Sequence, residues 1–138
     1  MRQEALKEKM PALRAYFKQS INIATVYLYG SFGTSRYVSG MSDLDLAILY
    51  CQEIPLMQEM KICADISVLL ERENVDTLNL NRARVDLCHE VLLTGEIIYE
   101  REPALTADFV ERTLQYYFDY GIPLRKVKLE LLDSFQRR

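Results

Sequence analysis

Two carboxylates and a glycine-serine turn are the groups in this sequence best suited to chemistry. Gly30 and Ser31 end a short apolar run, and Asp43 and Asp45 open a second one. Alternate residues of a strand face the same way, so both carboxylates would leave one face, with Cα atoms about 7 Å apart. Mg²⁺ is bound in proteins through one or two carboxylates together with phosphate oxygens and water. The spacing therefore predicts metal-dependent chemistry on a nucleotide.

The turn itself is suited to phosphate. Gly30 has no Cβ, so its backbone can approach a ligand closely and can adopt a positive φ. Ser31 adds a hydroxyl and an N–H where a helix would begin, and helix N-termini favour anions. The alternative is that Ser42 and Asp43 form an ordinary turn with one solvated carboxylate. The upstream Gly-Ser turn makes the phosphate interpretation the stronger one.

Hydrophobic periodicity predicts the elements that must position these residues. Pro11 should kink the first helix or start it again, because proline lacks an N–H. Gly121 and Pro123 should separate the last two helices. The predicted helices span 2–19, 55–72, 81–94, 104–120 and 123–136, and the predicted strands span 23–29, 43–50, a segment around Asp76, and 96–99.

With these residues in view, the chain resembles a known family. Gly30-Ser31, a gap of eleven residues and then Asp43-Leu44-Asp45 are similar to the signature of the DNA polymerase β-like nucleotidyltransferases. Within that superfamily the chain looks most like the minimal nucleotidyltransferases that act as antitoxins of HEPN toxins. The resemblance extends over about residues 26–99. The gap is one residue longer than is common in the family, and Phe32-Gly33-Thr34-Ser35-Arg36 stands where an Ala-Arg-Gly is usual.

The resemblance implies an α/β fold, with a small mixed sheet flanked by helices and with C-terminal helices. We expect a single nucleotidyltransferase domain over 1–138, with a core over about 21–100 and a helical extension over about 103–138. The implied activity is transfer of AMP from ATP, with two Mg²⁺ ions, to a tyrosine hydroxyl of a HEPN toxin, which is thereby neutralised. Gly30, Ser31 and Arg36 would bind the nucleotide, and Asp43 and Asp45 would hold the metal ions.

The superfamily also implies a third carboxylate, for which the sequence offers two candidates. Asp76 lies in a short β-prone segment that could pair beside the Asp43 strand and aim its carboxylate at the same metal ions. Asp65 lies where the spacing of Leu56, Met60 and Cys63 favours a helix, although an alternating strand fits as well. Asp76 is preferred as a metal-binding and catalytic residue.

Composition agrees with a small cytoplasmic enzyme. The chain has 138 residues and a formal net charge of −3, so it lacks the basic balance typical of proteins that bind nucleic acid. No apolar stretch approaches the length needed to span a membrane. Three cysteines with no paired spacing predict reduced thiols. The chain leaves no room for its own acceptor domain, which favours an acceptor presented by another macromolecule.

The C-terminal third is the most plausible partner surface. One short helix carries more aromatic surface than a single core-facing stripe requires: Phe109, Leu114, Tyr116, Tyr117, Phe118 and Tyr120. Core packing explains this slightly better, and a partner interface is the alternative. His89, the sole histidine, is expected at a structural position. A homo-oligomer and a hetero-oligomer with the toxin are both open. Two rival functions also remain: an antitoxin that acts by occlusion alone, and a small-molecule adenylyltransferase of the aminoglycoside-modifying kind.

Overall fold

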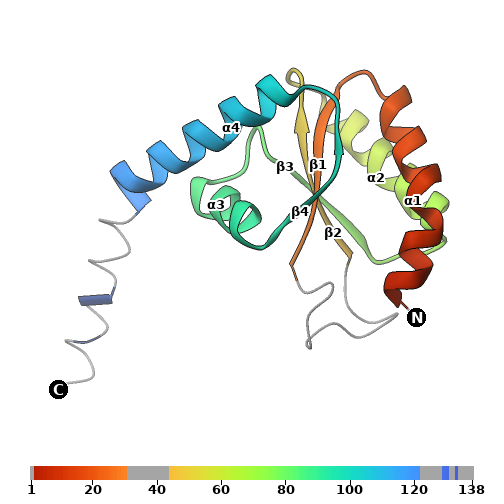
Figure 1. Ribbon diagram of the computed structural model, residues 1–138, viewed down its shortest axis with the longest axis horizontal. Helices are drawn as coiled ribbons and strands as arrows, with labels where there is room; N and C mark the ends of the chain where they lie inside the picture. Colours follow the sequence, from red (N-terminus) through yellow and green to blue (C-terminus); the bar gives the residue numbers. More distant parts are fainter. Residues whose placement is uncertain (1, 31–43, 122–128, 131–132, 134–138) are drawn as a thin grey trace.

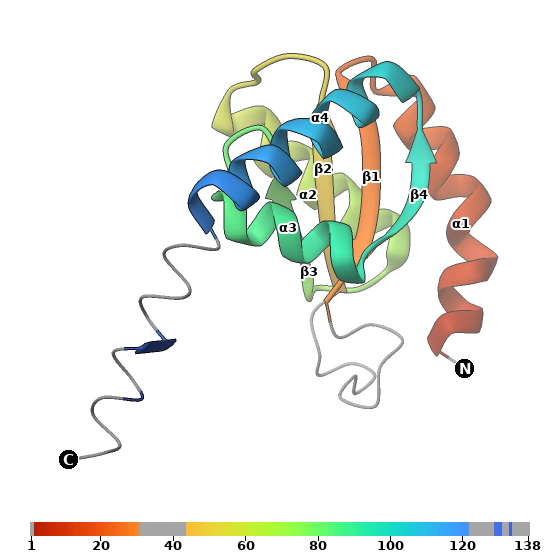
Figure 2. The ribbon, with the colours of Figure 1, turned by 60° about the vertical axis from the view of Figure 1, so that its left-hand side comes forward.

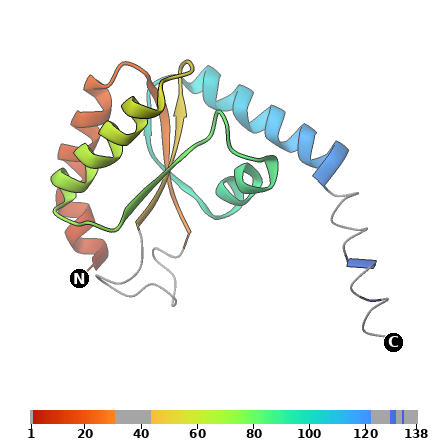
Figure 3. The same cartoon turned by 180° about the vertical axis from the view of Figure 1, so that it is seen from behind.

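A mixed four-stranded sheet lies between two pairs of helices (Figures 1 and 3). The computed structural model describes residues 2–30, 44–121, 129–130 and 133. The elements in chain order are α1 (Arg2–Gln19), β1 (Ile23–Tyr29), β2 (Leu44–Tyr50), α2 (Leu56–Leu70), β3 (Val75–Asn79), α3 (Val85–Thr94), β4 (Glu96–Glu100), α4 (Pro103–Tyr116) and the π-helical turn η1 (Tyr117–Gly121).

The strand order is β3-β2-β1-β4. β1 pairs antiparallel with both β2 and β4, whereas β2 and β3 are parallel. Parallel neighbours cannot be joined by a tight turn, so α2 provides the crossover between them. β1 is buried along all but its last residue, and β2 is buried except at Asp45. Burial on both faces explains why these two segments read as continuous apolar runs.

Helices cover both faces of the sheet and create two cores. α1 and α2 pack on one face, and α3 and α4 pack on the other (Figure 3). Successive strand residues contribute to opposite cores because their side chains alternate. The first core includes Leu13, Phe17, Val26, Ile48 and Ile66. The second core includes Ala24, Tyr27, Leu49, Val91 and Phe109.

The α/β class and the mixed sheet confirm the expected fold, with differences at three helices. Pro11 lies inside α1, which continues as one α-helix, so a restart there is wrong. α3 begins at Val85 instead of residue 81, because the Asn81 side chain accepts a hydrogen bond from Tyr50 N and donates one to Tyr50 O. The last predicted helices differ too: α4 ends at Tyr116 and continues as η1, and most of 123–136 lies outside the described residues.

α4 belongs to the body of the fold. The buried hydroxyls of Thr25 and Thr106 lie 2.6 Å apart in a hydrogen bond, and the Phe109 ring packs 6.3 Å from that of Tyr27. Both contacts fix α4 against β1. Within the described part of the chain, no helix is long and apolar enough to cross a membrane.

Candidate active site

The candidate site lies in a row across the end of three strands. Asp45 on β2 faces Tyr29 on β1 in the antiparallel register and Asp76 on β3 in the parallel register. Each is two residues from a member of the second core, namely Tyr27, Ala47 or Leu78. Because side chains two apart share a face, the phenol and both carboxylates lie on the side of the sheet that α3 and α4 cover.

Gly30 closes this row at the end of β1. Its φ of +85° lies in the left-handed region, which favours glycine. A Cβ built at this position would lie 2.5 Å from Oδ2 of Asp45. Two independent constraints therefore favour glycine at position 30. The backbone is left-handed, and the Asp45 carboxylate occupies the space that a Cβ would need.

Electrostatics place a third carboxylate near the row. Burial, followed by the negative charges of Asp45, Asp76 and Glu90 in that order, raises the pKa of Tyr29 to about 12. Glu90 belongs to α3, so this helix brings an acidic side chain towards the end of the sheet. Tyr29 and Glu90 did not emerge from the sequence pattern. The alternation from Tyr27 to Tyr29 is the signal that could have placed the phenol on this face.

Three of the predicted site residues, Ser31, Arg36 and Asp43, lie outside the described residues. Gly30 and Leu44 are the described residues on either side of them. Both belong to the end of the sheet at which Tyr29 pairs with Asp45. Gly30, Asp45 and Asp76 are thus the predicted site residues whose positions the structure describes, and it brings these three together.

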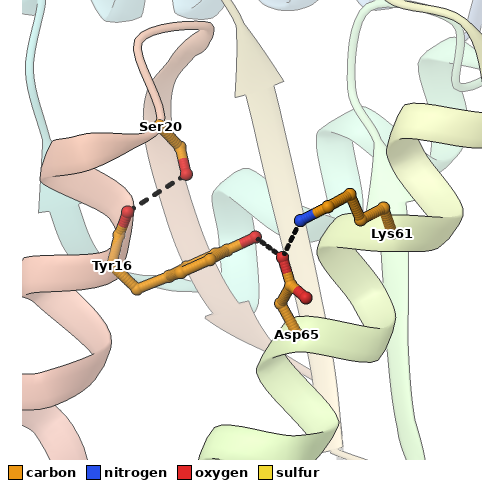
Figure 4. A network of polar contacts seen from close by, with 4 residues as sticks. All are labelled: Tyr16, Ser20, Lys61 and Asp65. Carbon is orange, nitrogen blue, oxygen red and sulfur yellow. Dashed lines mark hydrogen bonds and ion pairs between the residues drawn. The ribbon is translucent and has the colours of Figure 1, made fainter.

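Asp65 has a different environment on the opposite side of the sheet. It lies on α2, where its Oδ2 accepts hydrogen bonds of 2.8 Å from the Tyr16 hydroxyl and from Lys61 Nζ (Figure 4). The hydrogen bond from Lys61, followed by that from Tyr16, lowers the pKa of Asp65. Asp65 therefore links α1 to α2. Of the two candidates for the third carboxylate, only Asp76 is adjacent to Asp45.

The donor set fits Mg²⁺. In the described ranges no three His, Cys, Asp or Glu side chains are close enough to hold a metal ion by themselves. Asp45 and Asp76 supply two neighbouring carboxylates, and the Asp45 carboxylate lies against Gly30, where a side chain would otherwise be. Mg²⁺ takes few protein ligands and completes its shell with phosphate oxygens and water. A pair of oxygen donors beside a glycine turn meets this requirement.

The aromatic residues near the C-terminus divide between core and surface. Phe109 is buried, whereas Tyr116 and Phe118 are 56% and 61% exposed. His89 on α3 stacks on Tyr117 with ring centroids 3.6 Å apart and planes nearly parallel. This contact gives His89 a packing role and holds η1 against α3.

The site lies within the segment that matches a known family. Residues 12–104, about two thirds of the chain, match the family described as "Polymerase beta, Nucleotidyltransferase". The chain belongs to this nucleotidyltransferase family. The matched range contains Gly30, Asp45 and Asp76 and ends at the start of α4. A search of curated proteins finds no significant relative.

Solved structures with the same nucleotidyltransferase fold include antitoxin complexes. A crystal structure of a toxin-antitoxin with AMP-PNP superposes with a TM-score of 0.74 at 18% identity, covering 89% of this chain and 98% of that one. A complex of tri-AMPylated HEPN toxin with MNT antitoxin from Shewanella oneidensis gives 0.72 at 18% identity, covering 96% and 99%. A toxin-antitoxin MntA-HepT structure gives 0.70 at 16% identity, covering 91% and 98%. These likenesses establish the nucleotidyltransferase fold over nearly the whole chain.

Proposed function

We propose that the protein is an antitoxin that transfers AMP from ATP to a tyrosine hydroxyl of a partner HEPN toxin and thereby neutralises it. The observation that carries this proposal is the pairing of Asp45 with Asp76 beside the left-handed Gly30, inside the nucleotidyltransferase segment. The fold is shared with structures that contain an ATP analogue and an AMPylated HEPN toxin. Both features favour nucleotidyl transfer to a protein.

Each site residue has a role in this scheme. Gly30 and Ser31 would bind the β- and γ-phosphates through backbone N–H groups and a hydroxyl, with Arg36 as a further phosphate contact. Asp43, Asp45 and Asp76 would hold two Mg²⁺ ions, which supply charge neutralisation on the triphosphate when bound.

The reaction is an in-line displacement at the α-phosphorus. The acceptor hydroxyl oxygen forms a new bond to this phosphorus, the bond to the oxygen bridging to the β-phosphate breaks, and pyrophosphate leaves. Asp76 accepts the hydroxyl proton. The protein contributes mainly positioning and electrostatic stabilisation, since transfer at phosphorus does not require a covalent intermediate with the protein. Because Asp76 is exposed on the third strand, an acceptor from another molecule can reach it.

ATP labelled at the α- or the γ-phosphate distinguishes transfer of AMP from transfer of the terminal phosphate. The protein is incubated with Mg²⁺, a HEPN toxin encoded beside its gene, and ATP labelled at either the α- or the γ-phosphate. We expect the α-label alone to appear on the toxin, and Asp45→Asn to abolish its transfer. Transfer of the γ-label would indicate a kinase instead. Binding of the toxin without transfer of either label would favour the occlusion function.

A further inference from the structure

One face of α3 exposes apolar side chains beside the candidate site. The helix buries Cys88 and Val91 in the second core, whereas Leu87 and Leu93 are 39% and 72% exposed. Figure 2 shows α3 crossing the sheet below α4, towards the end where β1 stops and β2 begins. Single exposed apolar side chains are common on protein surfaces, whereas a group of them beside a candidate site indicates an interaction surface.

Contacts at the end of α3 fix its place relative to the carboxylates. The backbone N–H of Gly95, which follows α3, donates to Val91 O. A Cβ on Gly95 would also approach Leu28 O to 3.5 Å, so the end of the helix touches the end of β1. Ile97 on β4 pairs with Tyr27 and is 44% exposed. The chain thus passes from Leu93 to Ile97 beside the last residues of β1, with Ile97 opposite Tyr27.

The same surface is acidic. Glu90 is exposed, lies between Leu87 and Leu93 in sequence, and acts on Tyr29 together with Asp45 and Asp76. Among the described residues, no cation pairs with its carboxylate within 4.0 Å, whereas the nearby Asp86 is paired with Arg84. The surface formed by Leu87, Glu90, Leu93 and Ile97, here called the α3 rim, therefore combines apolar area with a negative charge that no cation in the described part of the chain pairs.

We propose that the α3 rim docks the segment of the partner protein that presents the acceptor hydroxyl, and that this segment carries a basic side chain among apolar ones. The inference rests on the proposed function and adds to it the surface and the chemistry of the acceptor. Charge complementarity selects the occupant. A basic side chain can pair with Glu90, whereas an acidic one would be repelled by Glu90.

The position of the rim also explains why docking would matter for transfer. A segment held on Leu93 and Ile97 would lie beside the end of β1, the strand on which Tyr29 faces Asp45. Docking would hold the acceptor hydroxyl close to the reacting phosphorus, so the transfer step becomes effectively unimolecular and its activation barrier is lowered. Partner binding and AMP transfer should therefore respond together to changes in the rim.

Calorimetry with the HEPN toxin encoded beside the gene tests the proposal without requiring transfer. We expect Leu93→Asp and Glu90→Lys each to weaken toxin binding at least tenfold, and Leu93→Asp to leave ATP binding unchanged. Val68→Asp and Glu53→Lys are matched controls, because Val68 is 78% exposed on α2, on the opposite face, and Glu53 is exposed after the far end of β2. These controls should bind the toxin as the wild type does.

Three outcomes separate the possibilities. Equal toxin binding by the rim variants and the controls would overturn the docking surface even if AMP transfer occurs. Weaker binding by the rim variants, combined with no AMP transfer by the wild type, would keep the docking surface and reject the proposed function. A change in self-association of Leu93→Asp, seen by sedimentation with no change in toxin binding, would assign the rim to a second copy of this chain and overturn the proposal.

Discussion

At the scale of single residues, the Asp45 carboxylate lies so close to Gly30 that it leaves no room for a side chain at position 30. Gly30→Ala would place a methyl group against the Asp45 carboxylate and would keep a left-handed backbone that costs roughly 1–2 kcal/mol for a residue with a Cβ. We expect lower stability by about that amount and a large loss of transfer. Unfolding in urea measures the first effect. In the Asp45→Ala background the stability cost of Gly30→Ala should become smaller, and an unchanged cost would contradict the contact.

The carboxylates differ in what their removal should do. We predict that Asp43→Ala, Asp45→Ala and Asp76→Ala each abolish Mg²⁺-dependent transfer and leave the fold intact, since the proposed role of all three carboxylates is to hold Mg²⁺. Asp65→Ala should retain transfer and lower stability, because Asp65 joins two helices. Transfer assays and circular dichroism on the same preparations compare the four variants. An active Asp76→Ala beside an inactive Asp65→Ala would refute the choice of third carboxylate.

At the scale of elements, the contact between α1 and α2 gives a prediction on pH. Because the pKa of Asp65 is lowered in the folded protein, its charge stabilises the fold above the ordinary carboxyl value of about 3.9. That contribution is lost as the pH falls through the lowered value. Asp65→Asn should therefore be less stable than the wild type at pH 7, and the difference should shrink below about pH 4. Denaturant unfolding at both pH values measures it, and a constant difference would contradict the assignment.

α4 provides the second test at this scale. Phe109 is buried against Tyr27, so Phe109→Ala should cost about 3 kcal/mol or more, whereas Phe118→Ala, at an exposed aromatic, should cost under about 0.5 kcal/mol. Thermal and urea unfolding compare the two. Equal costs would mean that α4 is not part of the core. The sequence left core packing and a partner surface open for these aromatic residues, and the structure buries Phe109 on α4 and exposes Phe118 on η1.

The sequence predicts best those elements whose pattern of apolar residues lies within the element itself. Continuous apolar runs defined β1 and β2 to within a residue, because these strands are buried on both faces. The start of α3 was missed, since Asn81 is held by Tyr50, which is 31 residues away. Asp76 was preferred over Asp65 on β propensity, but its adjacency to Asp45 depends on strand register. Glu90 could not be found from its neighbours in sequence, because only the packing of α3 on the sheet brings it to the site.

At the scale of the whole molecule, two helical layers enclose a central sheet (Figure 1), and the candidate site lies at one end of this sheet. The helices on the α1 and α2 side have a structural role, as the Asp65 network illustrates, and α3 and α4 pack on the face that carries Tyr29, Asp45 and Asp76. This division predicts that surface changes on α2 leave transfer intact, whereas changes on α3 reduce it.

Intact-mass analysis of the toxin tests the central claim most directly. The protein is incubated with ATP, Mg²⁺ and the HEPN toxin encoded beside its gene, in parallel with the Asp43→Ala, Asp45→Ala double variant. We predict mass increases of whole AMP units on the toxin, located on tyrosine by fragmentation, with the wild type and none with the double variant. An unmodified toxin that both proteins neutralise equally would contradict the account and assign neutralisation to binding alone.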